Sequence, residues 1–177
     1  LLSATPDEEV ARDFILFGRP DVTVVVVDGM RLERNLNLVL QVLQITNRAV
    51  VCVNLIDEAK AHGIEVDCRG LARDLGVPVV PAAARKGEGI PELLKEMLAA
   101  ASGEAVGQPY RLKYEVPQLS QAVATTAELL RQAFPNLPHV EWIALRLLEG
   151  DRRVIAALES RELGQLAGDH GATVVAA

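Results

Sequence analysis

Aromatic residues are scarce in this chain of 177 residues, which has one Trp, two Tyr and three Phe. Proteins that bind single-stranded nucleic acid use aromatic rings as stacking platforms. The net charge of −6 also repels phosphate backbones, and no basic run offsets it. The composition therefore argues against nucleic acid as a partner.

Cysteines are few, and long apolar runs are missing. Cys52 and Cys68 are the only two cysteines, and neither has a second Cys or His at the spacing of metal ligands. No apolar run exceeds the length of a strand, and no charged start followed by an apolar stretch indicates a signal peptide. We therefore expect idle thiols, no metal site and a cytoplasmic chain without a membrane span.

Two phosphate-binding motifs are also absent. The sequence contains no G-x-x-x-x-G-K-[ST], in which backbone N–H groups, the lysine and the hydroxyl hold nucleotide phosphates and Mg²⁺. A dinucleotide enzyme needs a glycine-rich turn after its first strand, and Asp28-Gly29-Met30 is not one. Any nucleotide would have to be recognised here without these motifs.

What the chain does contain is an alternation of strand and helix patterns. Three apolar, mostly β-branched runs predict buried strands at 22–27, 49–53 and 77–81. Helices are predicted from residue 6, over 32–43, 57–61 and 71–75, and over 91–101. In the first of these, Val10, Phe14 and Phe17 share one face. This order predicts an α/β fold with a parallel sheet and crossover helices.

A second, all-helical part follows a composition break at 102–109. Trp142, Leu145 and Leu148 form one apolar stripe there, from which we expect Trp142 to be buried between helices. Gly150-Asp151 is typical of a helix stop followed by a new N-cap. We divide the chain into domains 1–105 and 106–177.

The most informative motif is Asn54-x-x-Asp57, which directly follows the second strand. Asp57 could accept hydrogen bonds from the adjacent N1-H and N2-H2 groups of guanine in one charge-assisted, bidentate pair. Adenine offers no such donor pair. This is the pattern with which GTPases read guanine. The alternative is structural, with Asn54 and Asp57 serving as turn and N-cap residues that open a helix at Glu58.

A second loop strengthens the nucleotide interpretation. The third strand leads into Ala83-Ala84-Arg85, where the small side chains would let the backbone approach a ring. In doubly wound GTPases a loop in this order, similar to Ser-Ala-Lys, bonds the guanine oxygen through a backbone N–H. A ligand-free loop is the alternative.

Six segments carry a family resemblance: 6–13 (PDEEVARD), 32–36 (LERNL), 54–60 (NLIDEAK), 75–79 (LGVPV), 84–89 (ARKGEG) and 147–151 (LLEGD). Together they resemble the ferrous iron transport protein B family, namely its cytosolic GTPase domain and the helical domain that follows. The resemblance covers nearly the whole chain. In this family Asn-Met-x-Asp is typical, which the apolar Leu55 fits, whereas Ala83 replaces a usual serine.

The resemblance implies a partial, P-loop GTPase-like sheet followed by a small helical domain resembling a guanine nucleotide dissociation inhibitor. It implies that Asn54 and Asp57 read guanine, that Leu55 covers a ring face, and that Ala83, Ala84 and Arg85 close the pocket. GTP or GDP is the expected ligand. The expected partner is the transmembrane part of the same Fe²⁺ transporter, at the cytosolic face of the cell (inner) membrane. A homo-oligomer is left open.

The missing phosphate motif limits these expectations. The sequence resembles a GTPase domain without its first strands, so we expect weak nucleotide binding, no catalytic residue and no GTP hydrolysis by this chain alone. Mg²⁺ is expected only together with an upstream segment. The alternative function is a degenerate, non-enzymatic α/β interaction module.

Overall fold

A computed structural model describes residues 6–18, 20–104, 107–111, 116–160 and 162–164. The chain divides into two compact units, 1–112 and 113–177. Our predicted boundary between 105 and 106 lies outside the described residues.

The first unit is built on a parallel sheet of three strands in the order β1-β2-β3, as predicted. The strands are β1 (Thr23–Asp28), β2 (Ala49–Asn54) and β3 (Val79–Pro81). Asp28 is paired with Asn54 at the last position of the β1–β2 register, and Val53 is paired with Pro81. Because parallel strands end at the same edge of a sheet, the segments that follow Asn54 and Pro81 lie side by side.

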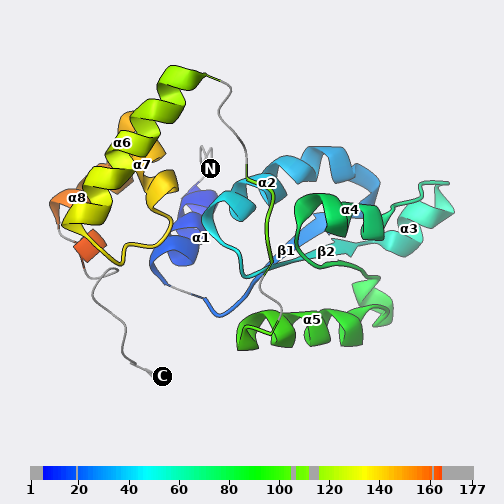
Figure 1. The fold of residues 1–177 in the computed structure, drawn as a ribbon. Helices are drawn as coiled ribbons and strands as arrows, with labels where there is room; N and C mark the ends of the chain where they lie inside the picture. The colour runs from blue at the N-terminus through cyan, green and yellow to red at the C-terminus, as the bar shows by residue number, and fades with distance from the viewer. Residues whose placement is uncertain (1–5, 19, 105–106, 112–115, 161, 165–177) are drawn as a thin grey trace. The chain divides into compact units, whose positions relative to one another are not determined.

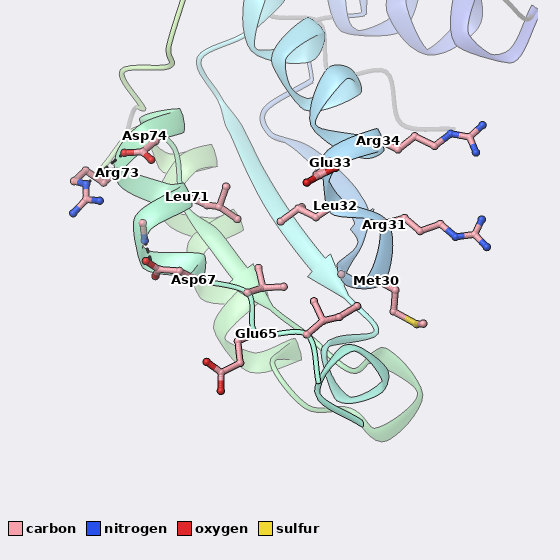
Figure 2. Close-up of a pocket in the computed structure, with 14 residues that line it drawn as sticks. Met30, Arg31, Leu32, Glu33, Arg34, Glu65, Asp67, Leu71, Arg73 and Asp74 are labelled. Atoms are coloured by element: carbon pink, nitrogen blue, oxygen red, sulfur yellow. Dashed lines mark hydrogen bonds and ion pairs between the residues drawn. The ribbon is translucent and has the colours of Figure 1, made fainter. Parts of the chain in front are cut away.

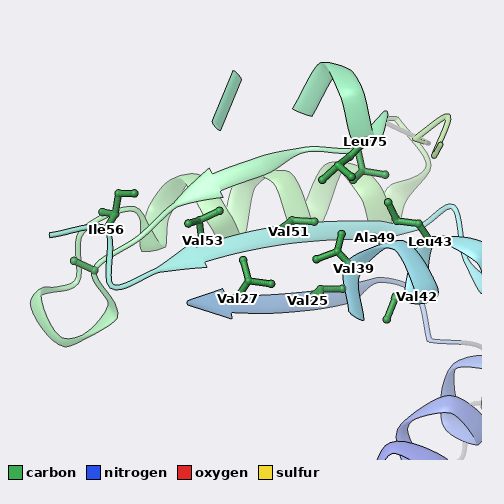
Figure 3. Packing of buried hydrophobic residues seen from close by; sticks show 12 residues of the cluster. Val25, Val27, Val39, Val42, Leu43, Ala49, Val51, Val53, Ile56 and Leu75 are labelled. Carbon is green, nitrogen blue, oxygen red and sulfur yellow. The ribbon is translucent and has the colours of Figure 1, made fainter. Parts of the chain in front are cut away.

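Helices cover both faces of this sheet (Figure 1). α2 (Leu32–Ile45) and α4 (Cys68–Leu75) pack on one face, and α5 (Ile90–Ser102) packs on the other. Figure 3 shows the larger core, in which side chains from one face of β1 and β2 meet Val39 and Leu43 of α2 and Leu75 of α4. The β-branched strand residues and the apolar stripe of α2 thus fix the position of the sheet's carboxyl edge.

One face of β1 is less covered than its apolar sequence predicts. Among the described residues no strand pairs with the outer side of β1, and Val26 is 59% exposed. Leu94 and Leu98 of α5 are exposed as well. The run 22–27 predicts burial on both faces, but α5 packs against Val50 of β2 and Val80 of β3 and leaves Val26 open.

α1 (Pro6–Phe17) begins at the predicted proline, but its buried face differs from the predicted stripe. Val10 and Phe14 are exposed, whereas Leu16 and Arg12 are buried. Arg12 pairs with Asp13 at 3.0 Å, and this ion pair compensates a buried charge that apolar spacing alone does not reveal.

The described part of the second unit contains α6 (Pro117–Ala133), α7 (Val140–Leu148) and α8 (Arg152–Glu159). Trp142 is 5% exposed, which confirms its predicted burial, and the guanidinium of Arg146 lies 5.3 Å from its ring centroid. Leu145 is buried, but Leu148 at the end of α7 is exposed, so that part of the stripe is wrong. Asp151 caps α8 as predicted. None of the helices in the described part is long and apolar enough to cross a bilayer.

Candidate functional site

The candidate site lies where β2 gives way to α3 (Ile56–Ala61). Leu55 connects them in a left-handed conformation, with φ 59° and ψ 30°. On either side of it the backbone is held by β3, because Ala82 N–H donates to Val53 O (2.8 Å) and Ile56 N–H donates to Ala82 O (3.1 Å). These two bonds lock the turn that carries Asn54 and Asp57 against the segment after β3.

A compact loop follows β3 and contains the short 3₁₀ helix η2 (Ala84–Lys86). The N–H of Ala83 donates to Glu88 O (3.0 Å), and the N–H of Lys86 donates to Ala83 O (2.8 Å). Gly89 ends the loop at φ +77°, where a Cβ would overlap the carbonyl oxygen of Pro81. Internal backbone bonds and this glycine therefore give the loop a defined shape.

Asn54 joins the two predicted motifs. Its Oδ1 accepts a hydrogen bond from the backbone N–H of Ala84 at 3.1 Å, across 30 positions of sequence. Ala84 belongs to the loop whose backbone is predicted to bond the guanine oxygen, and its own N–H is here engaged by Asn54.

Asp57 is the second residue of α3 and faces the loop. Its carboxylate pairs with Lys86, with 2.7 Å between Oδ2 and Nζ. The hydrogen bond from Lys86 lowers the pKa of Asp57, and the same bond raises the pKa of Lys86. The residue before α3 is Leu55, whose side chain makes no cap, so the alternative that Asp57 is the N-cap is wrong.

These residues surround a pocket of about 330 Å³. This volume falls at the lower end of the range for small-molecule sites, about 300–1,000 Å³. Five of the six predicted site residues line it, and Asn54 lies behind it as the tether of the loop; the lining residues are Leu55, Asp57, Glu58, Ala83, Ala84, Arg85 and Lys86. Sequence reasoning missed Lys86 and Glu58. The only signal for Lys86 is its place directly after the predicted loop triplet.

A larger pocket, of about 640 Å³, contains none of the predicted site residues. It lies between the start of α2 and residues 64–74, where Leu32 and Leu71 point toward each other across the opening (Figure 2). Arg31 and Arg34 extend away from it. We place the candidate chemistry at the smaller pocket, because five of the six predicted site residues line it. Within the described ranges, no group of three His, Cys, Asp or Glu side chains is arranged to hold a metal ion.

Comparison with known sequences gives a consistent result. The family model described as "Ferrous iron transport protein B" matches residues 1–97. A Fe(2+) transporter FeoB from Salmonella choleraesuis (strain SC-B67) is 37% identical over 145 residues, which are 82% of this chain and 18% of that protein. The counterpart from Escherichia coli (strain K12) is 36% identical over the same coverage. The chain thus spans about a fifth of the length of these curated relatives.

Solved structures agree with the sequence comparison. The cytosolic domain of the T. maritima FeoB iron transporter in apo form superposes with a TM-score of 0.76 at 29% identity, covering 91% of this chain and 62% of that one. The same domain in its GMPPNP form gives 0.75 at 28%, covering 92% and 63%. The cytosolic domain of L. pneumophila FeoB gives 0.76 at 26%, covering 95% and 66%.

Proposed function

Because the chain belongs to the ferrous iron transport protein B family, we propose that its first unit supplies the guanine-reading part of a GTP-binding domain that regulates an Fe²⁺ transporter. The observation that carries this proposal is the hydrogen bond from Ala84 N–H to Asn54 Oδ1, which brings the two base-reading segments to one pocket. Relatives solved in GDP and GMPPNP forms support the choice of ligand.

In this proposal each residue has a distinct task. Asp57 accepts from guanine N1-H and N2-H2, because an aspartate side chain is ionised at neutral pH and offers two acceptor oxygens. Leu55 covers one face of the ring, and the stem of Arg85 covers the rim. Asn54 holds the loop at the correct distance. Recognition of the base by these groups requires no metal ion, and we assign none of them to catalysis or to Mg²⁺.

The wider context is also a proposal. The unit would work at the cytosolic face of the membrane, beside the transmembrane part of the same transporter, and the helical unit would tune nucleotide release. A homo-oligomer is compatible with the exposed apolar side chains of β1 and α5.

The test is a titration of the 177-residue chain with nucleosides, which carry no phosphate, followed by amide chemical shifts. Guanosine should shift the amides of 54–58 and 83–87, and adenosine should not. In Asp57→Asn an amide donor replaces one acceptor, so guanosine binding should fall. Xanthosine, which carries a carbonyl where guanosine has its amino group, should bind the variant better than the parent. Unchanged guanosine affinity without a gain for xanthosine would contradict the proposal.

The second candidate is a non-enzymatic interaction module. The exposed Val26, Leu94 and Leu98 favour it, because they offer apolar area on one face of the sheet and its covering helix. A chain that binds neither guanosine nor GDP, yet is captured through this face by a protein partner, would support it.

A further inference from the structure

Lys86 engages the carboxylate that the proposed function assigns to guanine. Its Nζ lies 2.7 Å from Asp57 Oδ2. Building on the proposed function, we propose that Lys86 is an internal competitor for the base: its ammonium takes the place of the guanine donors on Asp57 and must leave before the base binds.

The ammonium of Lys86 and the N–H groups of guanine both donate hydrogen bonds to the carboxylate of Asp57, so they compete for the same oxygens. An ammonium presents three N–H donors and a full charge, whereas guanine presents two adjacent N–H donors that need both carboxylate oxygens. With Lys86 in place, Oδ2 is already engaged by a charged donor. Guanine therefore exchanges with an existing ion pair instead of meeting a free carboxylate.

The structure also offers a route by which Lys86 can leave. Three hydrogen bonds within the loop, from the N–H groups of Ala83, Lys86 and Gly87, fix its backbone, so only the side chain has to move. That side chain is 57% exposed and lines the pocket. The negative charges of Glu88 and Glu58 also raise the pKa of Lys86, so the surroundings of its ammonium stay negatively charged when it leaves Asp57.

The exposure of the Lys86–Asp57 ion pair determines how much guanosine affinity should change when Lys86 is removed. Ion pairs with this degree of exposure contribute little, so removing the competitor should strengthen guanosine binding by a factor of about three to five. Salt gives an independent signature. Guanosine is neutral, and raising the salt from about 0.01 M to about 1 M shortens the Debye length from about 30 Å to about 3 Å. Salt should therefore weaken the ion pair and strengthen guanosine binding to the parent chain.

The experiment compares guanosine titrations of the parent chain, Lys86→Met and the matched control Lys95→Met at both salt concentrations. Lys95 lies on α5, is exposed and does not line the pocket. We expect Lys86→Met to bind about three to five times more tightly than the parent at low salt and to lose the salt response. The control should behave as the parent does.

The outcomes separate this inference from the proposed function. If the parent binds guanosine and Lys86→Met binds equally or more weakly, Lys86 orients Asp57 or is idle, and the competitor is refuted while the guanine site stands. If none of the three chains binds guanosine, both the site and the competitor are refuted.

Discussion

Asn54 Oδ1 and the backbone N–H of Ala84 form a 3.1 Å hydrogen bond that ties the end of β2 to the loop after β3. It adds to the two backbone hydrogen bonds that Ala82 makes with Val53 and Ile56, and it reaches two residues further into the loop. This side-chain amide thus helps to set how far the loop stands from Asp57, and with it the width of the pocket.

Asn54→Ala should loosen the loop. We expect a loss of up to about 1 kcal/mol in unfolding free energy, typical of one net hydrogen bond, and faster hydrogen exchange of the Ala84 amide. Asn54→Asp keeps an acceptor and serves as the control, with exchange close to that of the parent. Equal protection of Ala84 in Asn54→Ala would show that the loop is held by other contacts.

Gly89→Ala should be far more destabilising than Gly87→Ala, although both glycines have positive φ. A Cβ on Gly89 would overlap the Pro81 carbonyl oxygen, whereas a Cβ on Gly87 meets nothing within 4 Å. We expect losses of about 2–4 kcal/mol for Gly89→Ala and about 1 kcal/mol for Gly87→Ala in urea denaturation. Similar losses for both would show that backbone conformation alone limits the loop.

Trp142→Ala should cost about 3–5 kcal/mol of unfolding free energy, because a large, buried ring leaves a cavity. As Trp142 is the only tryptophan, its fluorescence maximum in the folded chain should lie on the blue side of the water-exposed value. Leu148→Ala is the matched control on the same helix. Leu148 is exposed, so its truncation should change stability by less than about 0.5 kcal/mol.

Arg153→Met should remove a pH-dependent contribution to stability. Arg153 donates twice to Glu162, from Nη1 to Oε2 and from Nη2 to Oε1, both at 2.8 Å, and this lowers the pKa of Glu162. A lowered pKa stabilises the fold above the unfolded pKa of about 4.3, and that stabilisation is lost as the pH falls through the folded pKa.

In Arg153→Met, carboxyl NMR should show the pKa of Glu162 rising towards its ordinary value. The stability lost at neutral pH should stay below about 1 kcal/mol, because the pair is partly exposed. Arg152→Met, one residue earlier on the exposed side of α8, should leave the pKa of Glu162 in place.

The sequence predicts the sheet and its carboxyl edge well, because both depend on patterns within short segments of the chain. Three β-branched runs separated by helix patterns permit few topologies, and a parallel sheet places the segments after Asn54 and Pro81 together. The helix α4 is longer than predicted, starting at Cys68 instead of Leu71. Its start depends on Asp67, whose carboxylate accepts from the Gly70 N–H at 2.9 Å. Because glycine has a low helix propensity, the sequence predicts that the helix begins only after Gly70.

The features that the sequence does not predict depend on tertiary placement. Lys86 looks like a solvated loop residue, and its contact with Asp57 joins two segments that lie 29 positions apart in the sequence. Val26 looks like a core residue, and its exposure depends on which strands α5 covers. Side-chain direction in a loop and the footprint of a helix are not properties of a short window of sequence.

At position 55, fold stability and the proposed contact with the base favour different residues. The left-handed backbone favours glycine, whereas a contact with the ring favours an apolar side chain. Leucine in this conformation costs roughly 1–2 kcal/mol, which Leu55→Gly would largely recover, so urea midpoints should rise in that variant. A library randomised at position 55 and selected only for resistance to proteolysis should converge on glycine or asparagine. The same library selected for guanosine retention should keep apolar side chains that can lie on the ring. Recovery of leucine under the second selection alone would support the proposed role of Leu55 on the base, and convergence of both libraries on glycine would contradict it.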